Sequence, residues 1–355
     1  MDEILKELSS RCTGKKNSRM HIFDTTINPG ETTSFGLPLP ELLGYTPFYM
    51  PIKIIHGKTE GPCILLFATM RGDEFNGMEI INRLLKRSAL KKLSGTIIAV
   101  PVLNVYGMLN RSRFLPDGQL LDRAFPGKEY GNYAARLAYL FTDRLLGLAD
   151  VCVEYSSGQL NRNILPHVYT DLSREVNRAL AYSFQVSVIT NSDLHPGTIH
   201  SVAGEENMPI LTYRAGEAMR FSKKAIRMGV RGTIRLLRNL DMLPVDRREK
   251  KEAAPAPLIA QRSSWIYATK SGIAYHYKKV GDRVAENDDL ARISEPWGSF
   301  AEVTVKAPRE GIIVGSNDMP LVYEGDALFM LGRFKELDEA ADTLRAWPDQ
   351  NGPAG

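Results

Sequence analysis

The sequence predicts an α/β domain with a central mixed sheet and helices on both faces, followed by a small domain of short strands. Two observations carry this prediction. Over roughly the first two thirds of the chain, continuous apolar runs alternate with amphipathic stretches, and polar loops follow the apolar runs. After about residue 263 the runs become short and are broken by glycine. The first pattern is typical of a sheet covered by helices, and the second of a small barrel or sandwich.

The N-terminal part contains two strand signals. Residues 1–20 are expected to be an extension that starts as a short helix, and residues 21–50, rich in Pro, Gly and Thr, to be mostly irregular. Residues 51–56 alternate as a half-buried strand does, and a glycine turn separates them from the apolar run 63–67. An unbroken run of this kind predicts a strand that is buried on both faces.

The middle of the chain repeats the alternation of strands and helices. Apolar residues at helical spacing predict a helix over 78–92, and the run 95–102 predicts the next buried strand, reached by a right-handed crossover. The segment 104–127 is a polar loop of a length that is uncommon unless the loop is functional. The remaining elements are expected to be helices at 132–148 and 217–228 and strands at 150–154, 184–190 and 210–213.

A connector separates the two predicted domains. Residues 244–262 are charged and rich in Ala and Pro, which predicts a flexible linker between an α/β domain at 21–243 and a β-domain at 263–333. The tail, 334–355, is expected to begin as a helix and to lose regular structure towards its end.

Composition narrows the functional classes. A chain of 355 residues suits two domains, and its hydrophobic fraction of 43% and charged fraction of 24% are ordinary for a globular protein. A net charge of +4 is too balanced to predict binding to nucleic acid or to a membrane. No leader peptide is expected at the N-terminus, and three widely spaced cysteines are typical of a reducing cytoplasm.

The polar loop after the run 63–67 is the first candidate site. It reads Arg71-Gly-Asp-Glu-Phe-Asn-Gly77, and ligands gather beyond the carboxyl ends of the strands in sheets of this kind. A second stretch runs from Asn104-Val-Tyr-Gly107 to Leu121-Asp-Arg-Ala-Phe-Pro-Gly127, and a third is Glu154-Tyr-Ser-Ser-Gly158.

Together, and in this order, these stretches resemble the succinylglutamate desuccinylase/aspartoacylase family, which is related to the zinc carboxypeptidases. The C-terminal runs Val280-Gly-Asp-Arg-Val284 and Ala307-Pro-Arg-Glu-Gly311 resemble the lipoyl-like β-barrel that these proteins often carry. The resemblance implies a zinc-carboxypeptidase-like domain and hydrolysis of N-acyl amino acids at one zinc. It also implies two histidines and a glutamate as zinc ligands, a glutamate as general base, and arginines that hold a carboxylate.

Carried over to this chain, most of that chemistry is missing. Arg71 stands at the first histidine position, Glu74 at the glutamate ligand and Ser156 at the second histidine. An arginine has no lone pair to offer a metal, and a neutral hydroxyl is a poor zinc ligand. The general-base position falls at Arg214, with Glu217 as the alternative. In the middle stretch Asp122 replaces an asparagine, while Arg123 and Arg113 match the arginines that anchor the substrate.

We therefore hypothesise that an arginine–carboxylate network replaced the metal. Arg71 and Arg214 would supply positive charge beside Glu74, Asp122 and Glu154, since a buried acid without a counter-charge is costly. No cofactor is expected on this hypothesis. An alternative keeps zinc with relocated ligands, for which Glu74, His195 and His200 are the candidates.

Three functions stay open at this point. The leading prediction is a catalytically degenerate member, a pseudoenzyme, whose arginine-rich pocket binds a small carboxylate-bearing molecule or a protein partner. The second is a zinc-dependent amide hydrolase of N-acyl amino acids or small peptides. The third is a structural subunit that assembles through its β-domain, and the sequence leaves homo-oligomerisation open.

Overall fold

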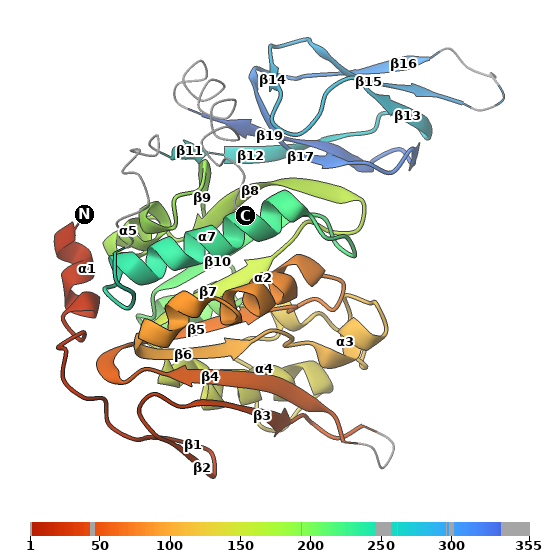
Figure 1. Cartoon of the computed structure of the whole chain (residues 1–355). Coiled ribbons are helices and arrows are strands. Elements are labelled where there is room, and N and C mark those ends of the chain that lie inside the picture. The colour runs from red at the N-terminus through yellow and green to blue at the C-terminus, as the bar shows by residue number, and fades with distance from the viewer. Residues whose placement is uncertain are drawn as a thin grey trace.

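A mixed sheet of 13 strands runs through the molecule (Figure 1). The computed structural model describes residues 2–42, 47–192, 194–245, 257–260, 262–295, 297 and 302–334. The main path of the sheet follows the order β12-β19-β17-β8-β10-β7-β5-β6-β4-β3. Strands β5, β6, β7 and β10 are mutually parallel, whereas the outer strands pair antiparallel, so the predicted mixed α/β sheet is confirmed.

The N-terminal 40 residues are more ordered than the composition suggests. Helix α1 (Asp2–Ser9) is the expected short helix, and its Leu5 and Leu8 are buried in the core. The prediction that residues 21–50 are mostly irregular is wrong. Two short strands pair as a hairpin, and a seven-residue strand extends the sheet by pairing with β4. These strands are β1 (Met20–Ile22), β2 (Thr25–Ile27) and β3 (Thr32–Pro38).

The central crossover agrees with the prediction. Strand β4 (Tyr49–His56) precedes β5 (Thr59–Ala68), helix α2 (Phe75–Leu85) follows, and β6 (Ser94–Val100) returns parallel to β5. The predicted helix 78–92 is divided, because its last part is the 3-10 helix η1 (Ser88–Lys92).

The long polar segment contains two short helical turns. These are α3 (Val105–Leu109) and η2 (Leu121–Arg123). Helix α4 (Tyr133–Arg144), with η3 (Leu146–Leu148) after it, and strand β7 (Val151–Ser156) lie close to their predicted positions.

The last third of the α/β domain departs most from the prediction. Strand β8 and helices α5 and α6 were not expected, and helix α7 begins six residues later than predicted. The elements are β8 (Arg162–Thr170), α5 (Glu175–Phe184), β9 (Val188–Asn191), α6 (Ile199–Glu205), β10 (Ile210–Gly216) and α7 (Lys223–Asn239).

Helices cover both faces of the sheet, as expected. One core packs α1, α2, α5 and α7 against one face through residues such as Ile80, Leu180 and Ile226. The other packs α4 and α6 against the opposite face through residues such as Phe141 and Val202. Figure 1 shows α2 and α7 in front of the strands and α4 behind them.

The sheet continues into the C-terminal domain, since β17 pairs with β8. Part of the expected linker is also ordered, because β11 (Leu258–Ala260) pairs with β9, whereas residues 246–256 lie outside the described residues. The expected tail helix also lies outside them, apart from Phe334. The remaining strands enclose a separate small core. They are β12 (Arg262–Tyr267), β13 (Gly272–His276), β14 (Arg283–Val284), β15 (Asp289–Ser294), β16 (Val303–Lys306), β17 (Gly311–Asn317), β18 (Leu321–Val322) and β19 (Ala327–Arg333).

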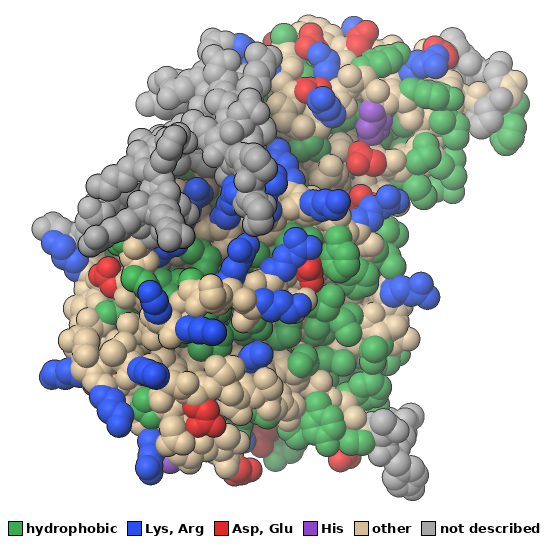
Figure 2. Space-filling view, in the orientation of Figure 1, with side chains coloured by type: hydrophobic (Ala, Val, Ile, Leu, Met, Phe, Trp, Pro, Cys, Tyr) green, Lys and Arg blue, Asp and Glu red, His purple; other side chains and the backbone are tan. Residues whose placement is uncertain are grey.

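The surface over α2 and α7 is rich in Lys and Arg side chains (Figure 2). On α7 the apolar residues face inward, while Lys223, Lys224 and Arg227 are exposed. Among the described residues, no helix is both long enough and apolar enough to cross a bilayer.

Candidate functional site

The parallel strands bring the three candidate stretches to one edge of the sheet. Arg71 and Glu74 follow the end of β5, and the pairing of β7 with β10 places Glu154 beside Thr212 and Ser156 beside Arg214. Alternate residues of a strand point to the same face. Glu154 and Ser156 therefore share one face of the sheet with their partners, whereas Tyr155 and Tyr213 pack into the core on the other.

The loop after β5 is held in a strained conformation. Thr69 has a φ of 56°, which is unusual for a β-branched residue. Its hydroxyl lies 3.1 Å from the carbonyl oxygens of both Glu74 and Pro101. Gly72 packs so tightly that an added Cβ would lie 2.0 Å from the backbone of Gly107. These contacts fix the positions from which Arg71 and Glu74 project.

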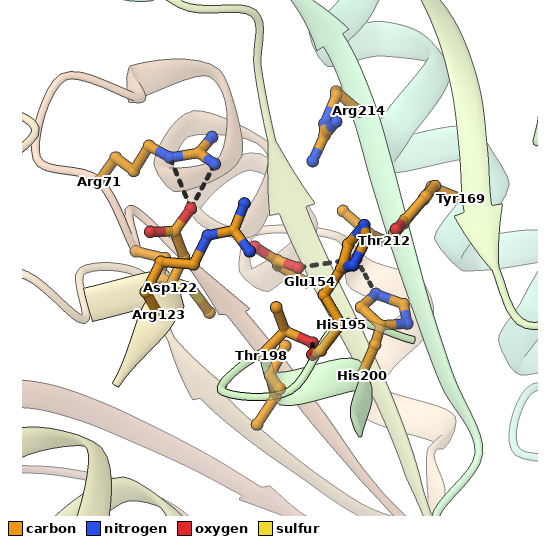
Figure 3. Close-up of a pocket in the computed structure, with 12 residues that line it drawn as sticks. Arg71, Asp122, Arg123, Glu154, Tyr169, His195, Thr198, His200, Thr212 and Arg214 are labelled. Carbon is orange, nitrogen blue, oxygen red and sulfur yellow. Dashed lines mark hydrogen bonds and ion pairs between the residues drawn. The ribbon is translucent and has the colours of Figure 1, made fainter. Parts of the chain in front are cut away.

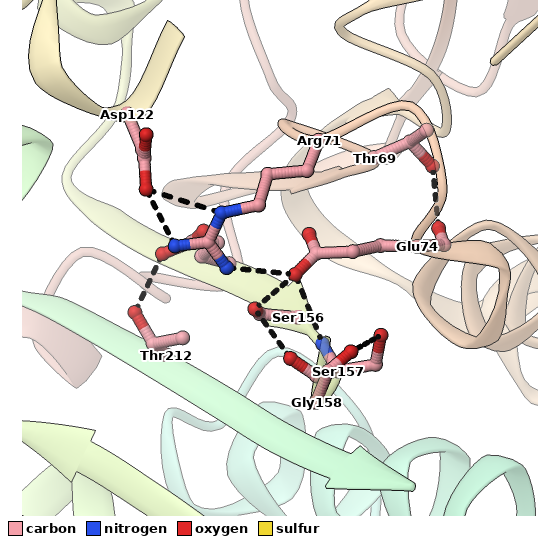
Figure 4. Close-up of polar contacts among 9 residues, drawn as sticks. Thr69, Arg71, Glu74, Asp122, Ser156, Ser157, Gly158 and Thr212 are labelled. Atoms are coloured by element: carbon pink, nitrogen blue, oxygen red, sulfur yellow. Dashed lines mark hydrogen bonds and ion pairs between the residues drawn. The ribbon is translucent and has the colours of Figure 1, made fainter. Parts of the chain in front are cut away.

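Arg71 lies between two carboxylates (Figure 4). Its Nη1 is 3.1 Å from Glu74 Oε1, and its Nε and Nη2 are 3.1 and 2.5 Å from Asp122 Oδ2. Burial alone would lower the pKa of Arg71, but attraction to Glu74 and Asp122 outweighs it and raises the pKa. The guanidinium is therefore a permanent positive charge at the centre of the site.

Glu74 is held through one carboxylate oxygen, Oε1, whereas its Oε2 is buried without a hydrogen-bond partner among the described residues. Ser156 donates from Oγ to Glu74 Oε1 at 2.8 Å, and the backbone N–H of Ser157 lies 3.3 Å from the same oxygen. Glu74 is the N-cap residue of α2, yet its side chain makes no capping hydrogen bond. Its carboxylate, only 2% exposed, is directed into the site instead of onto the helix.

A second polar chain lies at the base of the same face. Thr212 donates from Oγ1 to Glu154 Oε2 at 2.7 Å, and His200 Nε2 lies 2.7 Å from the same hydroxyl (Figure 3). Because the hydroxyl proton is given to the carboxylate, His200 must donate from Nε2. Burial and the charge of Arg214 lower the pKa of His200 to about 4, so this imidazole is neutral at pH 7. Burial raises the pKa of Glu154.

The polar chain of Glu154, Thr212 and His200 lines a cavity of about 230 Å³. Arg214 projects into this cavity (Figure 3), and its Cζ lies 5.5 Å from the centroid of the Tyr169 ring. It makes no hydrogen bond or ion pair with a described residue. The full lining consists of Met70, Arg71, Asp122, Arg123, Glu154, Tyr169, His195, Thr198, Ile199, His200, Thr212 and Arg214.

The structure corrects one predicted member of the pocket. Arg113 lies in a separate cavity of about 410 Å³ with Asp73, Arg162 and residues of the β-domain. Glu217, the alternative general base, also lies apart from the pocket and accepts from the backbone N–H of Asn161 at 3.2 Å. In contrast, His195 and His200 both reach the pocket.

Sequence reasoning missed Thr212 and Tyr169. Thr212 precedes Arg214 by two residues on a predicted strand, so the alternation of strand side chains could have placed both on the pocket face. Tyr169 belongs to β8, and no strand was predicted there, so the sequence offered no comparable signal.

Zinc, which the resemblance implies, does not fit these residues. The guanidinium of Arg71 lies against the one carboxylate that the metal would need, and Ser156 offers a hydroxyl that is bonded to that carboxylate. Of the relocated candidates, His200 uses Nε2 for Thr212, and among the described residues no three His, Cys, Asp or Glu side chains form a group that could hold a metal.

Comparisons with known proteins agree with this architecture. The chain is 23% identical, over 297 residues, to the N-alpha-acetyl-L-2,4-diaminobutyric acid deacetylase of Halomonas elongata, covering 81% of this chain and 86% of that enzyme. Among solved structures, the product-bound ectoine utilization protein EutE of Ruegeria pomeroyi is 20% identical with a TM-score of 0.77, covering 90% of this chain and 99% of that one.

A succinylglutamate desuccinylase/aspartoacylase from Rhodobacter sphaeroides is also 20% identical, with a TM-score of 0.78 and coverage of 89% of this chain and 100% of that one. Likeness at this level of identity shows the fold. Residues 60–240, which include both the Arg71 loop and Arg214, match the family model for the succinylglutamate desuccinylase/aspartoacylase catalytic domain. The chain therefore belongs to the succinylglutamate desuccinylase/aspartoacylase family.

Proposed function

We propose that this protein is a catalytically degenerate member of its family that binds a small carboxylate-bearing molecule without zinc. The observation that carries the proposal is the position of Arg71, whose guanidinium bridges Glu74 and Asp122. A metal-activated water requires an open coordination position on a bound ion. Here the carboxylate that would help to hold the ion is neutralised by an arginine.

The remaining arginines of the pocket supply the binding chemistry. Arg214 lines the cavity without an ion-pair partner among the described residues, and Arg123 lines its exposed side. Planar guanidinium groups match carboxylates with two parallel hydrogen bonds. A carboxylate that enters the cavity would therefore find two donors, while Arg71 stays occupied by its own acids.

The test measures how much zinc the protein retains. The protein is equilibrated with zinc and desalted, and we expect no stoichiometric zinc to remain. The matched control is the double variant Arg71→His, Ser156→His. It places two imidazoles around Glu74 and should retain about one zinc per chain. Retention of zinc by the unaltered protein would overturn the proposal.

A second candidate function is a working zinc-dependent amide hydrolase. It is favoured by the similarity to the Halomonas deacetylase, which extends over most of both chains. This candidate requires metal ligands other than those described above. Turnover of Nα-acetyl-L-2,4-diaminobutyrate that is lost with a chelator and restored by zinc would support it over the first proposal.

The role of the C-terminal domain is a separate proposal. Its four-stranded sheet and its strands of the 13-stranded sheet enclose a separate core, which supports a lipoyl-like barrel or sandwich. We propose that it serves assembly or covers the site. Sedimentation of the whole protein before and after substitution of its exposed Tyr277 and Tyr323 would test assembly.

A further inference from the structure

The pocket contains unsatisfied groups of opposite sign. Arg214 Nε and Asp122 Oδ1 are both buried and have no hydrogen-bond partner among the described residues. Glu154 accepts from Thr212 with one oxygen, and no described residue bonds the other. Buried groups without partners are costly, and an unpartnered guanidinium N–H together with an unpartnered carboxylate oxygen in one cavity indicates a ligand that both accepts and donates.

The charges of the site are balanced but unevenly distributed. Three arginines, at 71, 123 and 214, face three carboxylates, at 74, 122 and 154, so the site is neutral when its histidines are neutral. Arg71 is shared between Glu74 and Asp122, which leaves that side negative. Arg123 and Arg214 together outnumber Glu154, which leaves the other side positive. A net anion would disturb this balance, whereas a dipolar ligand would complement it.

From this distribution we infer that the ligand is a free α-amino acid and not its N-acylated form. The inference rests on the proposed function and specifies the ligand class of that site. The carboxylate lies against Arg214 and Arg123, and the ammonium group lies towards Glu154 and Asp122. Arg214 and Glu154 affect each other electrostatically but form no ion pair, so a molecule that carries both charges can join them.

The size of the cavity agrees with this ligand class. Its volume of about 230 Å³ lies below the range of about 300–1,000 Å³ that is typical for drug-sized ligands. Acylation would remove the positive charge from the ligand nitrogen and add atoms next to Glu154. The negative side of the pocket would then lack a counter-charge, so acylated amino acids should bind more weakly.

Calorimetric titration with matched ligands tests the inference. The probes are the 20 standard L-amino acids and L-2,4-diaminobutyrate, each compared with its Nα-acetyl derivative and its α-carboxamide. We expect at least one free amino acid to bind. Its acetyl and carboxamide derivatives should each bind at least about tenfold more weakly, because each loses one charge-assisted contact.

Variants assign the two ends of the ligand. Glu154→Gln should reduce the preference for the free amine over the acetylated amine to less than about threefold, while Arg214→Gln should weaken binding of both by about tenfold or more. The control is Asp73→Asn, which removes a buried carboxylate from the separate cavity of Arg113 and should leave the preference unchanged. Circular dichroism confirms that each variant is folded.

The possible outcomes separate this inference from the proposed function. If an acetyl derivative binds as tightly as its free amino acid, the inference is wrong and carboxylate binding stands. If carboxamides bind as tightly as the acids, the proposed function fails. If none of the probes binds, both fail.

Discussion

Substitution of Arg71 by methionine tests whether this residue replaces the charge of a metal. Methionine keeps the length of the side chain but leaves Glu74, which is 2% exposed, and Asp122 without a cation. Breaking a buried ion pair from one side costs about 3–5 kcal/mol. Glu74 keeps its donors Ser156 and Ser157, and Asp122 is 17% exposed, so we expect about 3 kcal/mol.

The assay is thermal unfolding at pH 7, compared with a matched control on the next helix. For a domain of this size 1 kcal/mol corresponds to about 2–4 °C, so Arg71→Met should lower Tm by about 6–12 °C. The control is Arg83→Met, because Arg83 pairs with Glu79 on the surface of α2. Exposed pairs contribute about 0–1 kcal/mol, so its Tm should fall by no more than about 4 °C.

A second substitution examines the cause of the loss. Adding Glu74→Gln to Arg71→Met removes the uncompensated buried charge, so the double variant should recover at least about 1 kcal/mol. An Arg71→Met protein no less stable than the Arg83→Met control would refute the reasoning, since it would mean that the acids do not need this cation.

Three further predictions concern the same site. His200 is neutral and buried in the folded protein, whereas in the unfolded state it takes up a proton between pH 6.5 and about 4. The free energy of unfolding should therefore decrease by up to about 3 kcal/mol as the pH is lowered through this range, and His200→Gln should reduce this loss in denaturant titrations. Glu154 behaves in the opposite sense: its raised pKa favours the folded state at low pH, so stability is lost above pH 4.5, and Glu154→Gln should gain stability relative to the parent between pH 4.5 and 7. Ser156→Ala removes a donor to a buried carboxylate and should cost about 1.5–3 kcal/mol in the same titrations; a loss below about 0.5 kcal/mol would contradict the hydrogen bond to Glu74.

The positions of the central strands and of the Arg71 loop could be predicted from the sequence, because hydrophobic pattern and loop composition there indicate the same boundaries. The run 63–67 is unbroken, a polar loop follows it, and apolar residues at helical spacing come next. The proximity of Arg71 and Asp122 followed from the order of the family motifs. No local signal relates two residues 51 positions apart, yet their side chains share a hydrogen bond.

Other features could not be predicted because local and tertiary preferences conflict. Strand β8 contains Asn163, Pro166 and His167, a composition typical of a loop, but it is held on both sides by β10 and β17. Arg113 was placed in the wrong cavity because the path of the long polar segment depends on contacts that span the whole domain. Its Nε is buried without a hydrogen-bond partner in the described part of the chain, in the cavity of Asp73 and not in that of Glu154.

If arginine replaced a metal, as we propose, the charges of the whole site must balance. A divalent ion carries two positive charges and Arg71 carries one, so Arg71 alone would leave the acids Glu74, Asp122 and Glu154 short of compensation. Arg214 lies on the neighbouring strand beside Ser156, where it lowers the pKa of both His200 and, against the effect of burial, Glu154. The two arginines therefore differ in their surroundings. Arg71 is paired with Glu74 and Asp122, whereas Arg214, on the proposed function, is available to bind a ligand.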